Sequence, residues 1–208
     1  MFADRVAAGR ALAQRLLSYA HAPDAIVLGI PRGGVVVAWE VAEVLHLPLD
    51  IVLAAKVGAP GNPEYAIGAL ALDGAVLVNP QSGATAEQVE AVAGPARAKI
   101  ERERRTLRGL RPPLQVGATT TAIVVDDGLA TGLTALAAVR WLKVQGAKVI
   151  FAVPVASVGA ARLLEPEVDS LVALEVPSGF SAVGQFYVQF GQTSDDEVRV
   201  LLGEQVSG

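Results

Sequence analysis

Five short and nearly unbroken apolar runs are spaced along the chain. They are Ala25–Ile30, Asp50–Ala55, Thr121–Val125, Lys148–Val153 and Leu171–Val176. Alternating apolar and polar residues would indicate a sheet with one face in water. Continuous runs rich in β-branched residues are instead typical of strands buried on both faces, as in parallel sheets. The pattern therefore predicts a parallel sheet enclosed between layers of helices.

Segments with helical spacing of apolar residues lie between these runs. They are Asp4–Tyr19, Gly34–Leu47, Ala86–Leu107 and Leu133–Val144. Gly146 stands where the glycine that ends a helix is expected. Because strands alternate with helices, we predict an α/β fold with a doubly wound, mainly parallel sheet.

Two regions depart from this alternation. Residues 57–83 are rich in Gly, Pro and Asn, which predicts a loop followed by a short hairpin around Asp73–Gly74. After Pro177 aromatic residues accumulate, which indicates a small C-terminal cap. We therefore expect a core domain over 1–176, with a flexible loop and hairpin at about 57–83 and a helical insertion at about 85–110, and a small subdomain over 177–208.

Composition excludes several classes of protein. With 208 residues, 52% of them apolar and 18% charged, the chain can bury a large core and is not generally disordered. It has no cysteine, which excludes disulfides, thiolate metal sites and a cysteine nucleophile, and its two histidines cannot build a histidine-rich zinc site. The net charge of −4 argues against a general nucleic-acid binder. The apolar runs are far shorter than the roughly 20 residues that span a bilayer. We expect a soluble, cytoplasmic protein.

The segment Ala122–Thr134, AIVVDDGLATGLT, carries the clearest candidate chemistry. A buried strand leads into Asp126 and Asp127, and a short loop with Thr131, Gly132 and Thr134 leads into a helix. Backbone N–H groups and hydroxyls at such a turn can hold a phosphate. Carboxylates suit sugar hydroxyls or the water shell of magnesium instead. The combination indicates a ribose phosphate, the structural alternative being two acids that only cap the helix.

This segment resembles the signature of the type I phosphoribosyltransferases, which use phosphoribosyl pyrophosphate (PRPP). The resemblance implies that the ribose 5-phosphate is held by a loop consisting of Gly128, Ala130, Thr131, Gly132, Leu133 and Thr134. It also implies that Asp126 and Asp127 hold the ribose hydroxyls, directly or through water bound to Mg²⁺. The resemblance assigns no direct protein ligand to the metal with certainty. The Mg²⁺ ion would be bound mainly through PRPP and pyrophosphate.

A second segment, Gly29–Gly34, lies where this family carries its pyrophosphate loop. Gly33 and Gly34 can present N–H donors, and the guanidinium of Arg32 can bind phosphoryl oxygens. A tight strand-to-helix turn would need the same glycines. The resemblance implies a cis peptide bond at Pro31–Arg32. It also implies a basic residue that contacts pyrophosphate, and the candidate is Lys56, at the end of the second predicted strand. Lys56 could equally be an ordinary lysine at a strand end.

The resemblance assigns roles to two further regions. Gly58–Ala71 takes the place of the flexible loop that closes over the ribose, with Glu64 and Tyr65 as its most reactive residues. Asn62, Pro63 and Glu64 would suit an ordinary turn equally well. The C-terminal cap takes the place of the family's hood, which receives the acceptor. Phe180, Phe186 and Tyr187 are candidates for stacking on a planar acceptor, or they form the core of the hood.

The run Arg97–Arg111 contains seven basic residues against Glu101 and Glu103. We interpret it as a solvated helix face with pairs at i,i+4 spacing. A subunit contact or an arginine that reaches the substrate is the second interpretation. Nucleic acid comes third, since no aromatic residues interleave the run.

The resemblance implies a PRPP-dependent phosphoribosyltransferase that needs Mg²⁺, in which Asp126, Asp127 and Arg32 are catalytic and a nucleobase is the favoured acceptor. A homodimer is expected, with no membrane and no nucleic acid as partner. A regulator that senses PRPP or a nucleotide without turnover is the main alternative, and a phosphohydrolase is the third. The sequence does not choose the acceptor.

Overall fold

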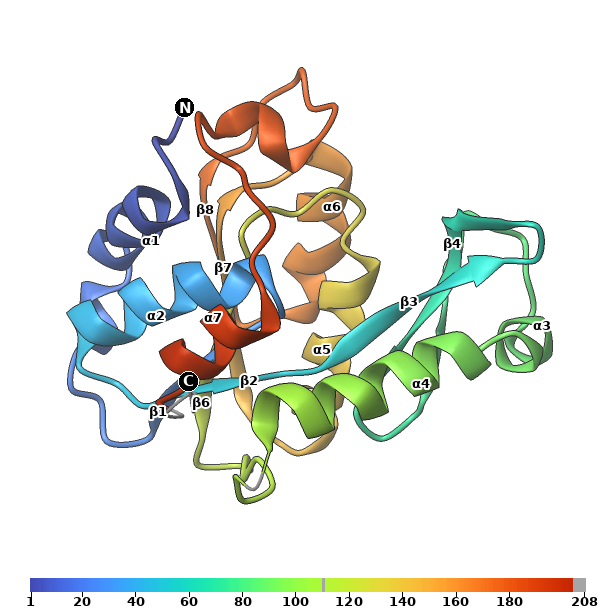
Figure 1. The fold of residues 1–208 in the computed structure, drawn as a ribbon, viewed down its shortest axis with the longest axis horizontal. Coiled ribbons are helices and arrows are strands. Elements are labelled where there is room, and N and C mark those ends of the chain that lie inside the picture. Colours follow the sequence, from blue (N-terminus) through green and yellow to red (C-terminus); the bar gives the residue numbers. More distant parts are fainter. Residues whose placement is uncertain (110, 204–208) are drawn as a thin grey trace.

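The structure is a computed structural model that describes residues 1–109 and 111–203, without the side chain of Glu64. Its central sheet has five parallel strands in the order β2-β1-β6-β7-β8 (Figure 1). The strands are β1 (Ala25–Gly29), β2 (Leu49–Ile51), β6 (Thr121–Val125), β7 (Lys148–Val155) and β8 (Ser170–Glu175). This confirms the predicted parallel sheet.

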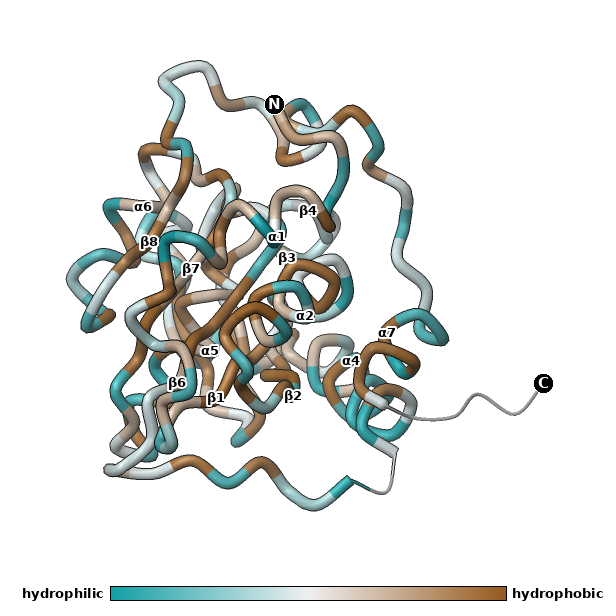
Figure 2. The backbone as a smooth tube through the Cα atoms, turned by 90° about the vertical axis from the view of Figure 1, so that its left-hand side faces the viewer, coloured by the Kyte–Doolittle hydropathy of each residue, from teal (hydrophilic) through white to brown (hydrophobic). Residues whose placement is uncertain are grey.

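Helices cover both faces of this sheet, because alternate residues of each strand enter different apolar clusters. Ile123 and Val125 of β6 pack with α1 (Arg5–Gln14) and α2 (Gly33–Leu45). Ala122 and Val124 pack on the other face with α5 (Leu133–Val144), and α6 (Val158–Leu164) lies on that face too. Figure 2 shows the hydrophobic residues gathered along the strands between these layers. The predicted doubly wound fold is confirmed.

The strand order reverses between β1 and β6. The chain leaves β1 toward β2 on one side, whereas β6 is followed by β7 and β8 on the other side. In open α/β sheets, ligands bind at the carboxyl ends of the two strands that flank such a reversal. The two sequence motifs directly follow these two strands.

A second, antiparallel sheet extends beside the first one (Figure 1). It consists of β3 (Ala54–Ala59), β4 (Asn62–Ala71) and β5 (Val76–Val78). The hairpin at Asp73–Gly74 is confirmed, with Gly74 at a φ of +76°. Two expectations are wrong: Asp50–Ala55 is divided between β2 and β3, and most of the predicted loop Gly58–Ala71 is strand. The strand packs closely, because a Cβ at Gly68 would lie 2.5 Å from the Leu77 carbonyl oxygen.

The predicted helix Ala86–Leu107 is interrupted. It consists of α3 (Ala86–Ala91), α4 (Gly94–Glu103) and a π-helical turn, η2 (Arg104–Arg108). The interruption precedes Pro95, in the first turn of α4, because proline lacks the N–H that an uninterrupted helix needs and its ring clashes with the carbonyl four residues before it. By contrast, α5 has the predicted bounds, and Gly146 follows it at a φ of +89°.

After β8 the chain crosses the top of the molecule in the view of Figure 1 and then runs down to the last helix. Short 3-10 turns lie at Leu17–Tyr19 (η1), Glu165–Glu167 (η3) and Val183–Phe186 (η4). The Phe2 N–H donates to the Phe186 carbonyl, so the start of the chain joins this cap. The last helix, α7 (Asp195–Leu201), packs through Val198 against the cluster around β3 and α4. The domain boundary at 176/177 stays a prediction. Within the described ranges no helix is both long and apolar enough to cross a membrane.

Candidate active site

The acidic pair lies directly after β6, at the point where the strand order reverses. Both side chains are partly buried, and the Asp127 N–H donates to Asp126 Oδ1 over 2.8 Å. Burial raises the pKa of the Asp126 carboxyl well above its ordinary value, and the neighbouring charge of Asp127 raises it further. Asp126 therefore binds a proton more readily than an exposed aspartate does.

Arg5 of α1 faces the second acid. Its Nε donates to Asp127 Oδ2 over 2.7 Å, and Nη1 donates to the Gly191 carbonyl over 2.7 Å. The guanidinium carbon also lies 4.0 Å from the centre of the Phe190 ring. Only 13% of the Arg5 side chain and 15% of the Asp127 side chain are exposed. Sequence reasoning missed Arg5, because 122 positions separate it from Asp127 and no local motif marks it.

The hood aromatics pack mainly on one another. Phe186 and Tyr187 are buried, with Phe186 beside Phe180 and Tyr187 beside Phe2. The Tyr187 hydroxyl donates to the Asp127 carbonyl over 2.5 Å, and burial raises the pKa of that hydroxyl. This packing favours the alternative that Phe186 and Tyr187 form the core of the hood, and their stacking on an acceptor stays a prediction. Phe180 is half-buried.

The loop after β1 contacts the acidic pair through its glycines. A Cβ at Gly33 would lie 2.0 Å from Asp127 Oδ2, and one at Gly34 would lie 2.9 Å from Asp126 Oδ1. Only residues without a Cβ permit this approach. The Pro31–Arg32 peptide bond is cis, as the resemblance implied. The two predicted motifs therefore lie against each other at one crevice.

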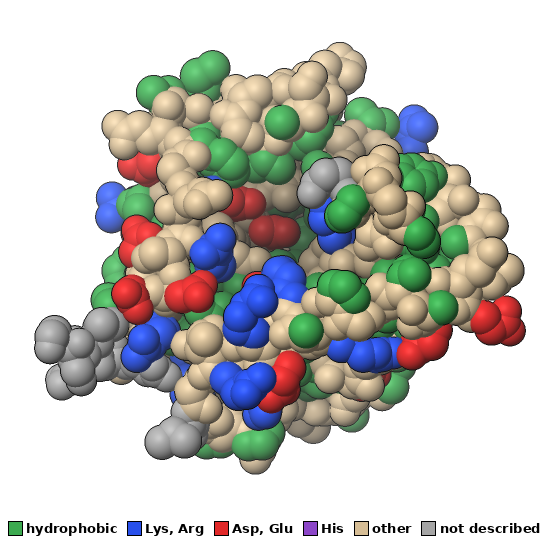
Figure 3. Space-filling model, turned by 45° about the vertical axis from the view of Figure 1, so that its right-hand side comes forward, with side chains coloured by type: hydrophobic (Ala, Val, Ile, Leu, Met, Phe, Trp, Pro, Cys, Tyr) green, Lys and Arg blue, Asp and Glu red, His purple; other side chains and the backbone are tan. Residues whose placement is uncertain are grey.

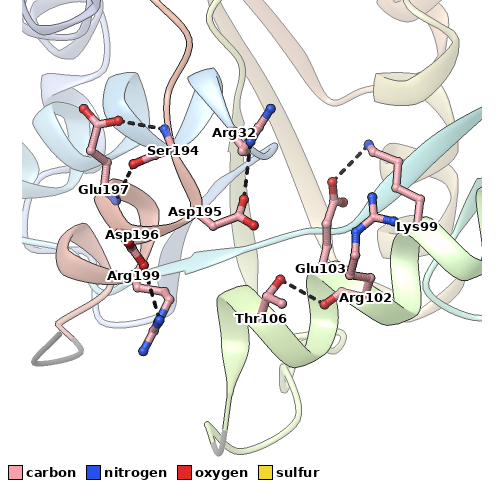
Figure 4. Close-up of polar contacts among 10 residues, drawn as sticks. All are labelled: Arg32, Lys99, Arg102, Glu103, Thr106, Ser194, Asp195, Asp196, Glu197 and Arg199. Atoms are coloured by element: carbon pink, nitrogen blue, oxygen red, sulfur yellow. Dashed lines mark hydrogen bonds and ion pairs between the residues drawn. The ribbon is translucent and has the colours of Figure 1, made fainter. Parts of the chain in front are cut away.

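Arg32 lies at the mouth of this site. Its Nη1 is 3.5 Å from Asp195 Oδ1 of α7, and both side chains are about half exposed. Figure 4 shows this pair across from Lys99 of α4, which pairs with Glu103 at 3.2 Å. In Figure 3 the same face is hollowed, with acidic side chains inside the hollow and basic side chains around its rim. An anion entering the hollow would meet the basic rim first.

The predicted phosphate loop lies on the other side of the acids. Gly132 has a φ of +79°, a conformation that favours glycine, and it directly precedes α5. The Ser157 hydroxyl donates to the Ala130 carbonyl over 2.7 Å and fixes the loop to the start of α6. The backbone N–H groups that begin α5 suit an anion at this position. Leu133 is buried, so its side chain is not available to a ligand.

A cleft of about 610 Å³ adjoins this loop. Thr131 and Ser157 line one wall, and Lys56 and Tyr65 line the other. Lys56 lies on β3 and not at the end of the second strand of the main sheet, so its predicted place in the fold is wrong although it lines a cleft beside the phosphate loop. Tyr65 is exposed, and its hydroxyl lies 3.4 Å from the Gln81 carbonyl. The predicted side-chain role of Glu64 lies outside the described residues.

The oxygen atoms of the acidic pair are of a kind that can bind Mg²⁺. Carboxylate oxygens are the protein ligands that Mg²⁺ prefers, usually with several waters retained. Asp126 and Asp127 supply such oxygens at the crevice, and within the described ranges no group of three or more His, Cys, Asp or Glu forms a metal site. The residues therefore fit an ion that takes most of its ligands from water and substrate.

Known proteins resemble this chain over nearly its whole length. A family profile described as "Phosphoribosyl transferase domain" matches residues 3–190. The chain is 42% identical over 206 residues to "Putative phosphoribosyl transferase Rv0571c" of Mycobacterium tuberculosis (strain ATCC 25618 / H37Rv), and the match covers 97% of this chain and 46% of the relative. It thus spans about half the length of this relative. The crystal structure of TT1426 from Thermus thermophilus is 40% identical, with a TM-score of 0.81 and 97% of each chain covered. The chain belongs to the phosphoribosyl transferase family.

Proposed function

We propose that this chain transfers the ribose 5-phosphate group of PRPP to a nitrogenous acceptor, with a nucleobase as the favoured class, and releases pyrophosphate. The bond between C1 and the pyrophosphate oxygen breaks, a bond from C1 to the acceptor nitrogen forms, and the acceptor loses a proton. The observation that carries the proposal is the contact between the two loops. Gly33 and Gly34 place the candidate pyrophosphate loop directly against the acids that follow β6.

In this proposal the basic and N–H groups bind the phosphates of PRPP, and the acidic groups contact its ribose. Arg32 and the N–H groups of Gly33 and Gly34 would stabilise the negative charge that develops on pyrophosphate. The phosphate loop would anchor the remote 5-phosphate, so that its binding energy orients C1. Asp126 and Asp127 would position the ribose hydroxyls and balance positive charge on the ribose. This site requires no side-chain nucleophile.

Magnesium fits this proposal as an ion shared between PRPP and the acids. Asp126 and Asp127 would hold it through water, and it would neutralise phosphoryl oxygens. The chain's own residues bind and orient the substrate around it.

The experiment combines turnover with binding. Pyrophosphate release is measured with PRPP, Mg²⁺ and a panel of purines, pyrimidines and small acids, and thermal stabilisation by PRPP is measured in parallel. Asp127→Asn and Thr131→Val should abolish the stabilisation that depends on Mg²⁺. Asp196→Asn on α7 and Thr119→Val in an exposed turn are matched controls that should keep it. Unchanged stabilisation in both site variants would refute the site.

A sensor of PRPP without turnover is the second candidate. The ion pair between Arg5 and Asp127 favours it, because Arg5 Nε already occupies Asp127 Oδ2 at 2.7 Å, so that this oxygen is not open to an acceptor. Tight PRPP binding without pyrophosphate release for any acceptor would support the sensor. Ribose 5-phosphate formation without any acceptor would instead indicate a phosphohydrolase.

A further inference from the structure

A second pocket lies away from the candidate active site. Its volume is about 250 Å³, and its lining residues include Arg104, Arg108, Arg111 and Trp141. Trp141 lies on α5 about two helical turns after Leu133, near the end of the helix that is remote from the phosphate loop. The pocket is therefore separate from the cleft beside that loop.

Arg108 enters this pocket from the π-helical turn η2 and is 6% exposed. Its Nη2 donates to Asp50 Oδ2 over 2.8 Å and to the Pro112 carbonyl over 2.6 Å. Its Nε is buried and has no acceptor among the described residues. The interpretation of the basic run as a solvated face is thus wrong at Arg108, although the pair between Lys99 and Glu103 fits it.

Arg111 carries a second orphaned donor. Its Nη2 has one long contact, 3.4 Å to the Leu49 carbonyl, and its buried Nη1 lacks an acceptor within the described part of the chain. Buried polar groups in proteins almost always have partners, and an exception calls for an explanation such as a ligand or a bound water. Here two such donors belong to Arg108 and Arg111, which both line this pocket.

The remaining walls restrict what the pocket can bind. Trp141, Leu72 and Leu114 form an apolar side, each partly buried. At the rim, Arg104 is already held by two bonds of 2.9 Å to Glu101, and the exposed Asp73 accepts from the Ala75 N–H. The carboxylates nearby thus have partners of their own, whereas Arg111 has no carboxylate partner among the described residues.

We propose that this pocket binds a small organic phosphate monoester. The phosphate oxygens would accept hydrogen bonds from the N–H groups of Arg108 and Arg111 that lack acceptors, because the planar guanidinium matches the geometry of phosphate oxygens. The planar or apolar part would lie against Trp141. The site does not rest on the proposed transferase activity, since it uses none of the residues assigned to PRPP.

The test uses Trp141 as the reporter. Trp39→Phe leaves Trp141 as the only tryptophan of the chain. Adenosine 5′-monophosphate is titrated as the probe, with inorganic phosphate and adenosine as separate arms. We expect saturation with the monophosphate, weaker binding of phosphate and no binding of adenosine. Arg111→Gln should weaken monophosphate binding about tenfold or more, because it removes charged donors. Arg15→Gln, at an exposed arginine that follows α1, should leave it unchanged.

Further variants show in which of the two pockets the monophosphate binds. Thr131→Val alters the phosphate loop and should not change the Trp141 signal. A signal that Thr131→Val abolishes and Arg111→Gln preserves would place the ligand in the active site and overturn the proposal. Equal affinity for phosphate and the monophosphate would overturn the role of Trp141, and no saturation at millimolar concentrations would overturn the site. If Arg111→Gln does not fold, Trp141→Leu is measured by calorimetry, where unchanged affinity refutes the proposal and weaker affinity supports it.

Discussion

Gly33→Ala should separate the two halves of the candidate active site. The added Cβ would lie 2.0 Å from Asp127 Oδ2 and 2.7 Å from Arg5 Nε, whereas real Cβ contacts are almost never below 3.0 Å. The carboxylate must therefore move by about 1 Å or more. Gly33 does not have a positive φ, so the backbone itself accepts alanine without strain. The effect should come from the contact alone.

The magnitude follows from the hydrogen bond that this movement breaks. A hydrogen bond to a charged group contributes about 1.5–3 kcal/mol, and the bond from Arg5 to Asp127 is largely buried. For a chain of this size, each kcal/mol lowers the melting temperature by about 2–4 °C. Gly33→Ala should thus lower it by about 3–12 °C.

Thermal unfolding with and without PRPP and Mg²⁺ measures both consequences. Gly33→Ala should melt earlier than the wild type and lose its stabilisation by PRPP. Gly94→Ala is the matched control, because a Cβ there meets nothing within 4 Å and the residue begins a helix. A Gly33→Ala protein with unchanged melting temperature and unchanged PRPP stabilisation would refute the proposed contact between the loops.

Two further variants test the charges at the site. Asp195→Asn frees Arg32 from a half-exposed ion pair that contributes about 0.2–1 kcal/mol, so PRPP should bind about 1.4- to 5-fold tighter at low salt. This gain in affinity should vanish at high salt. Asp196→Asn is the control, because the Asp196 carboxylate faces Arg199 instead, and it should show no gain. The raised pKa of Asp126 means that the folded state loses stability as pH rises above about 3.8, the ordinary value. Asp126→Asn should therefore raise the free energy of unfolding in urea at pH 8, and the gain should shrink toward pH 5. An equal gain at both pH values would contradict this origin.

The parallel sheet was predictable, because a strand buried on both faces needs apolar residues at every position. The second sheet was not predictable in the same way. β4 carries Ala66, Gly68, Ala69 and Ala71, small residues that allow close packing but lack the β-branched pattern of a strand. Its backbone pairing with β3 and β5, and not its composition, determines its structure.

The candidate site was predictable where its chemistry is local. Asp126, Asp127 and the glycines after β1 stand in short motifs, because in the proposed function each loop would bring several groups to one substrate. Arg5 and Asp195 act from elements that only the fold brings near, so no spacing along the chain marks them. The sequence left two roles open for the hood aromatics for a related reason, since a buried ring and a ring that contacts a ligand look alike in sequence.

The pairing of β1 with β6 has a consequence for the order of folding. Asp24, just before β1, contacts Thr121 at the start of β6 across 97 positions. Arg5 closes a longer loop to Asp127, and a still longer one, of 186 positions, to Gly191. Long loops carry a larger entropic cost of closure, and nonlocal contacts slow folding. We therefore expect the local contacts of β6–α5–β7 to form before the contacts of Arg5, which close far longer loops at the crevice.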